Sequence, residues 1–242
     1  MSEPLNMPPI VHYRLPPTAR QLCEVEHPLA ADPLAAGRRI HLRDPADGYL
    51  VGSSESSARM LSIEAFPWVE LSVIEAGELQ VQGEGFNLLL RAGDCLVVPR
   101  GAALRWQENG AVRRLFMAFP GLDLDATTPR QPLKLDLAAA LPVGNPPAAS
   151  VLLTETPKAW SETLFTAGEL RIGVWECEAY ARRQVEPAYS ELMFILQGVV
   201  TLSAQTGEQY QVRKGETVVV PRGATNAWSS TETVRKVFCI VS

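Results

Sequence analysis

A nine-residue segment of the chain occurs twice. It reads Gly93-Asp-Cys-Leu-Val-Val-Pro-Arg-Gly101 and then, 122 positions later, Gly215-Glu-Thr-Val-Val-Val-Pro-Arg-Gly223. Upstream residues recur 121 positions later, so we place a one-residue insertion between Gly77 and Gly85, where a hairpin loop would tolerate it. A repeat of this length predicts two similar domains. The other recurring residues are Gly52, Ala58, Glu70, Ile74, Gly77, Trp106, Val112, Arg113 and Phe116, which return as Gly173, Ala179, Glu191, Ile195, Gly198, Trp228, Val234, Arg235 and Phe238.

The bulk composition limits the class of protein. A chain of 242 residues has room for two domains with separate cores. A net charge of −5 and a pI near 5.3 argue against a nucleic-acid partner. No apolar run approaches the roughly 18 residues of a membrane span, and the first nine residues show no secretory signal. The four cysteines are scattered without a Cys-x-x-Cys motif, so we expect reduced, mostly buried thiols in a cytoplasmic protein.

Short strand patterns dominate both repeats. Residues 69–74 and 78–82 read as a β-hairpin, and residues 191–196 and 199–203 repeat it. Pro99 and Pro221 are expected at strand ends, because proline cannot donate a hydrogen bond to a sheet. Many short strands separated by Gly and Pro indicate an all-β sandwich or barrel.

The distribution of proline divides the chain into four parts. We predict an N-terminal arm over residues 1–47, a first barrel over 48–121, a linker over 122–157 and a second barrel over 158–242. The linker is expected to cross the surface, with a short strand at residues 132–137 pairing with one barrel. In the arm, residues 29–36 could supply one or two helical turns.

The spacing of these motifs resembles the cupin superfamily, and specifically its two-barrel members, the bicupins. Glu-x6-Gly, which closes the first cupin motif, occurs as Glu70 to Gly77 and as Glu191 to Gly198. Gly-x5-Pro-x-Gly, which opens the second motif, is the nine-residue segment described above. The C-terminal repeat is most similar to the branch with ureidoglycine aminohydrolase and the cupin-like ethanolamine-utilisation proteins. The resemblance implies two tandem jelly-roll barrels over about residues 48–121 and 165–242, and it says much less about function.

The resemblance also implies a metal site that this sequence does not reproduce. Metal-binding cupins carry His-x-His-x3/4-Glu and a further His after the second motif, whereas the three histidines here, His12, His27 and His41, all precede the first barrel. Imidazole is what holds a transition metal firmly in such a site. We therefore expect no cofactor, although a hard divalent metal held by Glu191 and Asn226 with help from waters or substrate stays open. The ligand positions hold Glu64 and Phe66 (or Ile63 and Ala65) and Leu104 in the first repeat, and Val185 and Pro187 (or Gln184 and Glu186) and Asn226 in the second.

The second repeat is the better candidate for a binding site. In the family register Glu191 points into its barrel, and strand alternation puts Tyr189 and Met193 on the same face. Asn226 and Trp228 would face them from the opposite strand. An apolar pocket with a few convergent polar groups is the usual form of a small-molecule site. The alternative is that Glu191 is a structural remnant, hydrogen-bonded to Asn226 or Tyr189.

The first repeat is expected to be mainly structural. Leu104 lies where a ligand would, beside Trp106, which suggests an interior filled with side chains around Glu70. Glu64 is either a partner carboxylate to Glu70 or a solvent-facing loop residue. Both Glu70 and Trp106 remain candidates for ligand contact. Arg113 and Arg235 occupy parallel positions and would pair with a barrel carboxylate, with an anionic substrate, or in surface salt bridges.

The opposite faces of the same strands are apolar. Leu192, Phe194 and Leu196 face outward in the second repeat, and Leu71 and Val73 do so in the first. Such faces must be covered. We expect the barrels to pack on each other, or on a second subunit in a homodimer, through these sheets.

Three functions are compatible with these features. The leading one is a cytoplasmic bicupin that binds a small polar metabolite in its C-terminal barrel, where Glu191 would orient the ligand or act as an acid or base, and Arg235 is a further candidate contact. The second is a metal-dependent enzyme of nitrogen-compound breakdown, and the third is a non-catalytic sensor or scaffold. Whether the protein is an enzyme is left undecided by the sequence. No nucleophile motif, phosphate loop or nucleotide fingerprint supports another enzyme class.

Overall fold

The computed structural model describes residues 9–14, 29 and 31–242 of the chain. The described residues form twenty β-strands and one short 3-10 helix. They divide into two compact units, which we call the first barrel (described residues 29 and 31–136, with 165–168) and the second barrel (described residues 9–14, 137–164 and 169–242). Cys23 and His27 lie outside the described residues. In the described part of the chain no helix is long and apolar enough to cross a membrane.

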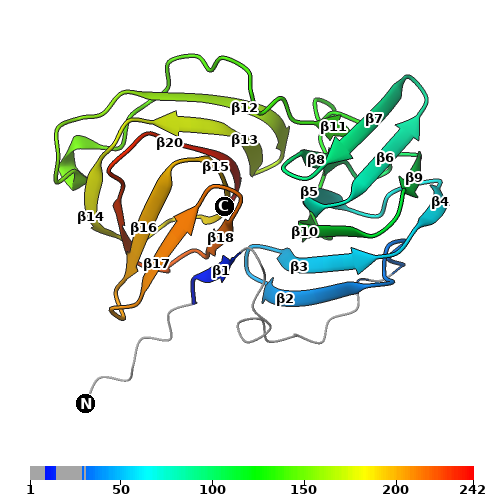
Figure 1. The fold of residues 1–242 in the computed structure, drawn as a ribbon, viewed down its shortest axis with the longest axis horizontal. Coiled ribbons are helices and arrows are strands. Elements are labelled where there is room, and N and C mark those ends of the chain that lie inside the picture. The colour runs from blue at the N-terminus through cyan, green and yellow to red at the C-terminus, as the bar shows by residue number, and fades with distance from the viewer. Residues whose placement is uncertain (1–8, 15–28, 30) are drawn as a thin grey trace. The chain divides into compact units, whose positions relative to one another are not determined.

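Each barrel consists of a six-stranded and a four-stranded antiparallel sheet (Figure 1). In the first barrel the strand orders are β11-β8-β5-β10-β3-β2 and β4-β9-β6-β7. The all-β class and the tandem barrels predicted from the repeat are confirmed. The strands of this barrel are β2 (Arg38–Asp44), β3 (Tyr49–Ser56), β4 (Arg59–Ile63), β5 (Val69–Ala76), β6 (Glu78–Gly83), β7 (Phe86–Arg91), β8 (Cys95–Val98), β9 (Leu104–Glu108), β10 (Val112–Phe119) and β11 (Leu133–Lys134).

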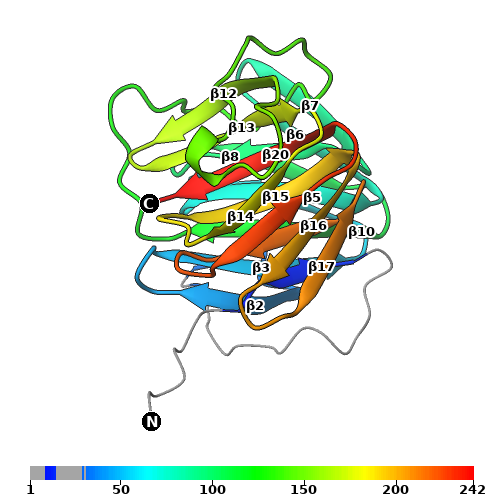
Figure 2. The same ribbon diagram turned by 90° about the vertical axis from the view of Figure 1, so that its left-hand side faces the viewer.

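The second barrel repeats this order strand by strand. Its sheets are β1-β18-β15-β20-β13-β12 and β14-β19-β16-β17, and the pairing of β16 with β17 can be followed in Figure 2. The strands are β1 (Val11–Tyr13), β12 (Ala159–Ala167), β13 (Leu170–Cys177), β14 (Ala181–Val185), β15 (Ser190–Gln197), β16 (Val199–Ala204), β17 (Gln209–Arg213), β18 (Thr217–Val220), β19 (Asn226–Ser229) and β20 (Val234–Val241), with the 3-10 helix η1 at Ala149–Val151.

The inserted residue lies in a hairpin loop, as predicted. In the first barrel Gly83 pairs with Phe86, which leaves a two-residue turn that ends in Gly85 at φ 80°. In the second barrel the amide of Ala204 donates to the carbonyl of Glu208, so the loop has one residue more and ends in Gly207 at φ 92°. The rest of the strand framework is therefore unaffected by the insertion.

The arm and the linker contribute strands to the sheets, so the units differ from the four expected parts. β2 from the arm extends the sheet of the first barrel, and β1 pairs with β18 at the edge of the second. The short strand expected at residues 132–137 is present as β11, which pairs with β8. The helical turns expected at 29–36 are not formed: described residues 31–37 make turns, and Gly37 takes a φ of 80° that a helix does not allow.

Both barrels are closed around apolar cores. Trp68, Trp106 and Phe116 are fully enclosed in the first, together with Phe66 and Leu79. The core of the second is built from shorter side chains such as Val200, Leu202 and Val218, with Trp228 as its largest member. Cys95, Cys177 and Cys239 are free thiols buried in these units. Burial raises the pKa of all three thiols, that of Cys177 to about 12, so they are unreactive core residues.

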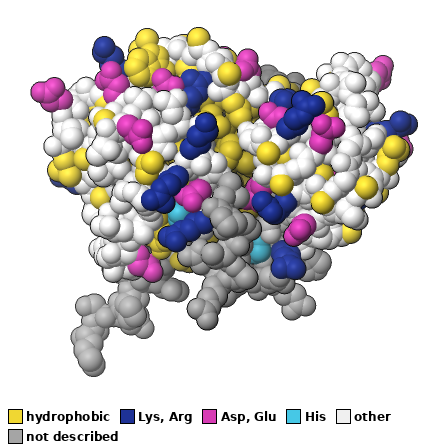
Figure 3. Space-filling view, viewed as in Figure 1, with side chains coloured by type: hydrophobic (Ala, Val, Ile, Leu, Met, Phe, Trp, Pro, Cys, Tyr) yellow, Lys and Arg dark blue, Asp and Glu magenta, His cyan; other side chains and the backbone are white. Residues whose placement is uncertain are grey.

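The outward apolar residues of the central strands are also buried. Leu71 and Val73 are 0% and 2% exposed, and Leu192 and Phe194 are 1% and 5% exposed. These are the exposed fractions in the single chain, so the chain itself covers these residues; a homodimer through these faces stays a prediction. Elsewhere, on the described part of the face in Figure 3, acidic and basic side chains are interspersed without a broad region of one sign.

Candidate functional site

The second barrel contains a cavity of about 590 Å³. It opens between the two sheets, and its lining comes from β12, β13, β14, β15, β19 and β20, together with the segment before β15. The predicted residues Tyr189, Glu191, Met193, Asn226 and Trp228 all line it. Strand alternation on β15 explains the first three, because residues two apart share a face.

The centre of the cavity is an ion pair. The ammonium Nζ of Lys236 on β20 lies 2.8 Å from Oε1 of Glu191 on β15. In the register of the two strands Ile240 lies opposite Glu191 and Lys236 lies opposite Ile195, so the Met193–Phe238 pair lies between them and the long side chain of Lys236 spans that distance. The side chains are 9% and 13% exposed, so both charges are largely removed from water but still reach the cavity.

A thioether and two aromatic rings also surround the ammonium group of Lys236. Its Nζ lies 2.9 Å from Sδ of Met193. It also lies 5.0 Å from the ring centre of Trp175 and 5.3 Å from that of Trp228, within range of cation–π attraction. A lysine with one carboxylate and two indole faces around it is fixed in position. It presents a stationary positive charge to anything that enters the cavity.

A second cation, Arg182 on β14, reaches the cavity from the facing sheet. Its guanidinium donates to the backbone carbonyl and, over 2.9 Å, to the side-chain oxygen of Asn226. Asn226 in turn donates to the carbonyl of Ala224. The amide that we expected to bind a ligand, or Glu191, is therefore used to position Arg182. Partial burial lowers the pKa of Arg182, which nevertheless stays a cation.

Aromatic rings form the remaining walls. Tyr180 stacks on Trp228 at 5.5 Å between ring centres, and Trp175 meets Trp228 edge-on at 5.9 Å. Tyr189 stands at the mouth and is 36% exposed. The charge of Glu191, helped by partial burial, raises the pKa of Tyr189, so its phenol stays protonated and can donate a hydrogen bond.

One polar atom of the cavity wall has no partner. Trp228 is 3% exposed, and its indole Nε1 is buried without a hydrogen-bond acceptor in the described part of the chain. A buried N–H group that lacks an acceptor costs about 1–3 kcal/mol, so such groups are rare. The position of this donor in a cavity wall makes it available to a bound molecule.

The equivalent region of the first barrel is filled. Glu70 is 0% exposed, and its two oxygens accept from Arg114 (2.6 Å), Arg38 (2.8 Å) and the indole of Trp68 (2.9 Å). Ser72 completes the set at 3.2 Å. Burial alone would raise the pKa of Glu70, but the charges of Arg38 and Arg114 outweigh it and lower that pKa to about 2. This carboxylate is a neutralised structural group, not a ligand site.

The tryptophan of the first barrel is satisfied internally. Nε1 of Trp106 donates to Oε1 of Glu108 over 2.9 Å, and Glu108 accepts a further pair of bonds from Arg59. The corresponding position of the second repeat is Ser230, whose hydroxyl lies at the backbone of Tyr180 instead. The internal acceptor present in one barrel is thus missing in the other.

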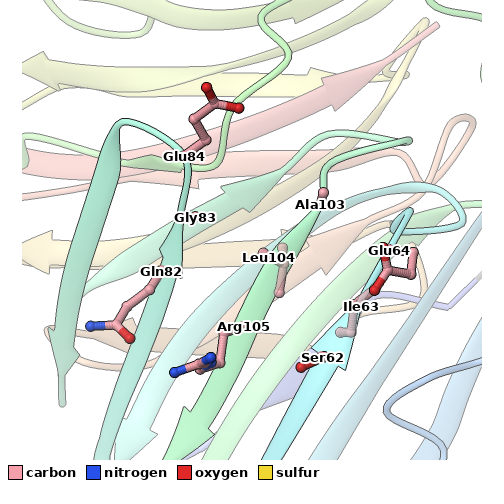
Figure 4. A pocket seen from close by; sticks show the side chains of 9 residues that line it. All are labelled: Ser62, Ile63, Glu64, Gln82, Gly83, Glu84, Ala103, Leu104 and Arg105. Carbon is pink, nitrogen blue, oxygen red and sulfur yellow. The ribbon is translucent and has the colours of Figure 1, made fainter.

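Three other candidate residues lie away from the cavity. Arg235 pairs with Glu176 at 2.9 Å and donates to the carbonyls of Leu137 and Ala139, and Arg113 pairs with Glu75. These are the salt bridges that we kept as an alternative. Glu64 is exposed on the rim of a hollow of about 380 Å³ in the first barrel, beside Arg105 (Figure 4), and takes no part in the hydrogen bonds of Glu70.

Sequence reasoning missed Lys236 and Arg182, two of the three cations that line the cavity. A signal for the first was present in the repeat, because Arg114 and Lys236 occupy equivalent positions one residue after the arginines that we chose. Strand alternation puts one residue of each consecutive pair inside and the other outside. In both barrels the inside residue is the second, and it bonds the buried glutamate.

The donors of the cavity do not fit a transition metal. Glu191 is occupied by the ammonium of Lys236, and the side-chain oxygen of Asn226 is occupied by Arg182. In one alignment the other family ligand positions hold Val185 and Pro187, which have no side-chain donor; in the alternative alignment Gln184 is outside the lining and Glu186 is exposed at the mouth. Among the described residues, no group of three or more His, Cys, Asp or Glu could hold an ion. No chemical step is therefore derived through a metal.

The chain is similar to several known proteins. Residues 166–238 match the family model of the EutQ-like cupin domain. Over 74 residues the chain is 32% identical to acetate kinase EutQ of Escherichia coli (strain K12), a match that covers 28% of this chain and 32% of EutQ. A solved protein of unknown function from Pseudomonas syringae pv. tomato str. DC3000, of the DUF861 family, is 30% identical at a TM-score of 0.88 and covers 96% of this chain and 99% of that one. A cupin 2 conserved barrel domain protein from Leptotrichia buccalis shares the fold at a TM-score of 0.60 and 13% identity, over 85% and 88% of the two chains.

Fold, motifs and matches together define a two-barrel cupin. The full-length similarity to the Pseudomonas syringae protein goes further than the local match. The chain belongs to the cupin superfamily and, within it, to the DUF861 family of that protein. The chain matches only about a third of the length of the curated EutQ relative, so the activity in that relative's name does not transfer by similarity.

Proposed function

We propose that this protein is a cytoplasmic bicupin that binds a small polar metabolite in its second barrel. The observation that carries the proposal is the cavity of about 590 Å³, in which Lys236, Arg182 and Glu191 converge between aromatic walls. Volumes of 300–1,000 Å³ with a few polar groups on an apolar lining are typical of small-molecule sites. The first barrel, where the same strand positions are filled, supports the assignment by contrast.

The roles of the residues follow from their contacts. Lys236 and Glu191 form a fixed dipole that orients a polar ligand, and Tyr189 can donate to it from the mouth. Trp175 and Trp228 contact the less polar part of the molecule. These groups are sufficient to bind a ligand, and none of them is an identified nucleophile. The proposed function is therefore binding.

A search for co-purified molecules tests this function. Untagged protein, purified without chelators, would be denatured, and the released compounds would be compared by mass spectrometry between wild type and Glu191→Gln. We expect a small polar compound enriched with the wild type and reduced about tenfold or more by the substitution, since a charged hydrogen-bond partner is lost. The matched control is Glu169→Gln, an exposed glutamate of the same barrel outside the cavity.

Two results would overturn the proposal. One is that no compound is enriched and no metabolite of a broad panel raises the melting temperature of the wild-type protein. The other is stoichiometric Mn, Fe, Ni or Zn in plasma mass spectrometry of the same sample, lost in Glu191→Gln. That result would return the metal-dependent enzyme to first place.

A further inference from the structure

The charge of the cavity identifies the class of its ligand, an inference that rests on the proposed function. We propose that the second barrel binds a small carboxylate, whose oxygens are held by the Arg182 guanidinium and the indole N–H of Trp228. Arg182 and Trp228 lie directly opposite each other in the register of β14 and β19, and both line the cavity. Both residues therefore belong to one wall of the cavity.

The first argument is the missing acceptor. In the first barrel the tryptophan N–H donates to an internal carboxylate, that of Glu108, at 2.9 Å. In the second barrel the equivalent Trp228 has the same core position, but Ser230 replaces the glutamate and the N–H has no acceptor among the described residues. A carboxylate brought by a ligand would supply the group that the first barrel builds in. It would also remove the penalty of an unsatisfied buried donor.

The second argument is the balance of charge. The lining includes three cations, Arg171, Arg182 and Lys236, and two carboxylates, Glu186 and Glu191. Glu191 is already neutralised by Lys236, and Glu186 is exposed at the mouth. Arg182 makes no ion pair within 4 Å of a described carboxylate: its hydrogen bonds go to the oxygens of Asn226, to the carbonyl of Arg183 and to the side chain of Tyr180, and Glu191 acts on it only as a more distant charge.

In the first barrel the interior arginines are paired with carboxylates. There Arg38 bonds both Glu70 and Asp32, at 2.8 and 3.1 Å, and Arg59 bonds Glu108 at 2.6 Å. Each interior arginine of that barrel has a carboxylate of the chain itself. Arg182, partly buried beside a cavity, lacks one. A half-buried guanidinium without an anion is a ready binding partner for a carboxylate.

The walls favour an organic carboxylate over an inorganic anion. Trp175, Tyr180 and Phe238 line the same cavity and offer apolar contact to the remainder of the molecule. A cationic ligand is disfavoured, because the carboxylate that could receive it, Glu191, would have to give up Lys236. The molecule that fits is therefore small, singly or doubly charged, and partly apolar.

Isosteric probes test the charge directly. Isothermal titration calorimetry of the full chain would use two triplets of equal shape: acetate, acetamide and acetamidinium, then benzoate, benzamide and benzamidinium. We expect the anion of at least one triplet to bind roughly tenfold or more tightly than its neutral amide. Trp228→Phe and Arg182→Gln should each reduce the affinity for that anion by about tenfold and reduce that for the amide, which has one neutral acceptor, by much less.

The controls are matched within the chain. Trp106→Phe makes the same change in the filled barrel, and Arg183→Gln removes an exposed arginine next to Arg182; both should bind the anion as the wild type does. Thermal melting would check that each variant is folded. If Trp228→Phe does not fold, the wild-type triplets and Arg182→Gln still decide.

The outcomes separate the two proposals. If the amide or the amidinium binds as well as the anion, or better, in every triplet that binds, the carboxylate inference is overturned and small-molecule binding stands. An anion preference that survives both substitutions overturns the assignment to Arg182 and Trp228. If folded wild-type protein binds none of the six probes at millimolar concentration, the carboxylate inference fails. The metabolite panel then decides the proposed function separately.

Discussion

The two barrels hold a glutamate at the same strand position and neutralise it in different ways. In the first, Glu70 is enclosed by two arginines, a tryptophan and a serine. In the second, Glu191 has a single lysine, and the space beyond it is a cavity. The interior of the first barrel is thus a core held by a buried ionic network. The interior of the second contains a cavity that a ligand can enter.

The two barrels differ at one position of an edge strand, and this difference leaves the interior of the second barrel open. The carbonyl oxygens of Arg39 and Glu162 approach Gly52 and Gly173 in the same way, since a Cβ at either glycine would meet them at 2.2 and 2.0 Å. The residues before them, Arg38 and Ser161, are therefore equivalent in space. Arg38 fills the first barrel by reaching Glu70, whereas Ser161 is a short residue on the cavity wall of the second.

The largest effect is expected at the buried glutamate of the first barrel. Glu70→Gln leaves the fully buried Arg114 without an anion and leaves Arg38 with Asp32 alone, and we expect a loss of about 3–5 kcal/mol in the free energy of unfolding. Glu191→Gln should cost less, about 1–2 kcal/mol, because its side chain and that of Lys236 still reach the cavity. Chemical denaturation of both variants measures the difference.

The pH dependence of stability follows from the same contrast. The pKa of Glu70 is lowered to about 2, below its ordinary value of 4.5, so its contribution is complete above pH 4.5 and is lost as pH falls toward 2. The Glu70→Gln variant should lack this part of the acid dependence. Equal losses in the two glutamate variants, with parallel acid profiles, would show that the barrels do not differ in the way described here.

The next effect is on binding. Ser161→Arg places in the second barrel the residue that fills the first, and its guanidinium can reach Glu191 as Arg38 reaches Glu70. We expect the substitution to reduce the affinity of the ligand or of the preferred probe by tenfold or more while the barrel stays folded. Calorimetry with the wild type as reference measures it. Thr166→Arg, at an exposed position of β12 that does not line the cavity, is the control for added charge.

Unchanged binding by a folded Ser161→Arg protein would mean that this position does not govern access to the cavity. The reciprocal change, Arg38→Ser, should destabilise the first barrel, because Glu70 and Asp32 both lose a partner. Binding at the second barrel should stay as it was in that variant.

The repeat and the two-residue period of strands were sufficient to predict the fold and one wall of the cavity. Glu191 and Met193 share a face because they are two apart on β15, and Trp228 follows from the family register. It was harder to predict which alternate residues of β20 face the interior of the barrel. A loop separates β20 from β19, and a register shift opposite Leu196 changes which residues of β20 lie opposite those of β15. For this reason Arg235 was considered as a site residue and Lys236 was not.

Other groups were hidden by distance along the chain. Arg38 bonds a residue 32 positions away, and β1 pairs with a strand more than 200 positions away. No local pattern in a proline-rich arm specifies such a partner. Arg182 belongs to a short strand of mixed polarity, where alternation does not indicate which side chain turns inward.

The smallest expected effect is a difference in stability between two edge strands, one in each barrel. β1 and β11 occupy the same edge in their sheets, next to β18 and β8. β11 is fixed by an ion pair of 2.7 Å between Lys134 and Asp94. β1 is fixed by His12, whose Nε2 lies 3.0 Å from Glu216.

The two pairs should respond differently to mild acid. Burial lowers the pKa of His12 below its ordinary value of 6.5; Glu216 opposes this shift, while Arg14 and Arg213 add to it. The undocked strand therefore binds a proton more readily than the docked one, so docking is strongest above pH 6.5 and weakens by a few tenths of a kcal/mol or more as pH falls below it.

Hydrogen exchange, corrected for the intrinsic rate at each pH, should show reduced protection of residues 11–13 and 217–219 between pH 7 and 5.5. Protection at residues 96–97 and 133–134 should be unchanged. His12→Gln removes the titrating group and should abolish the pH effect on β1; equal loosening of both edges, or a loosening that persists in His12→Gln, would assign the effect to something other than this histidine.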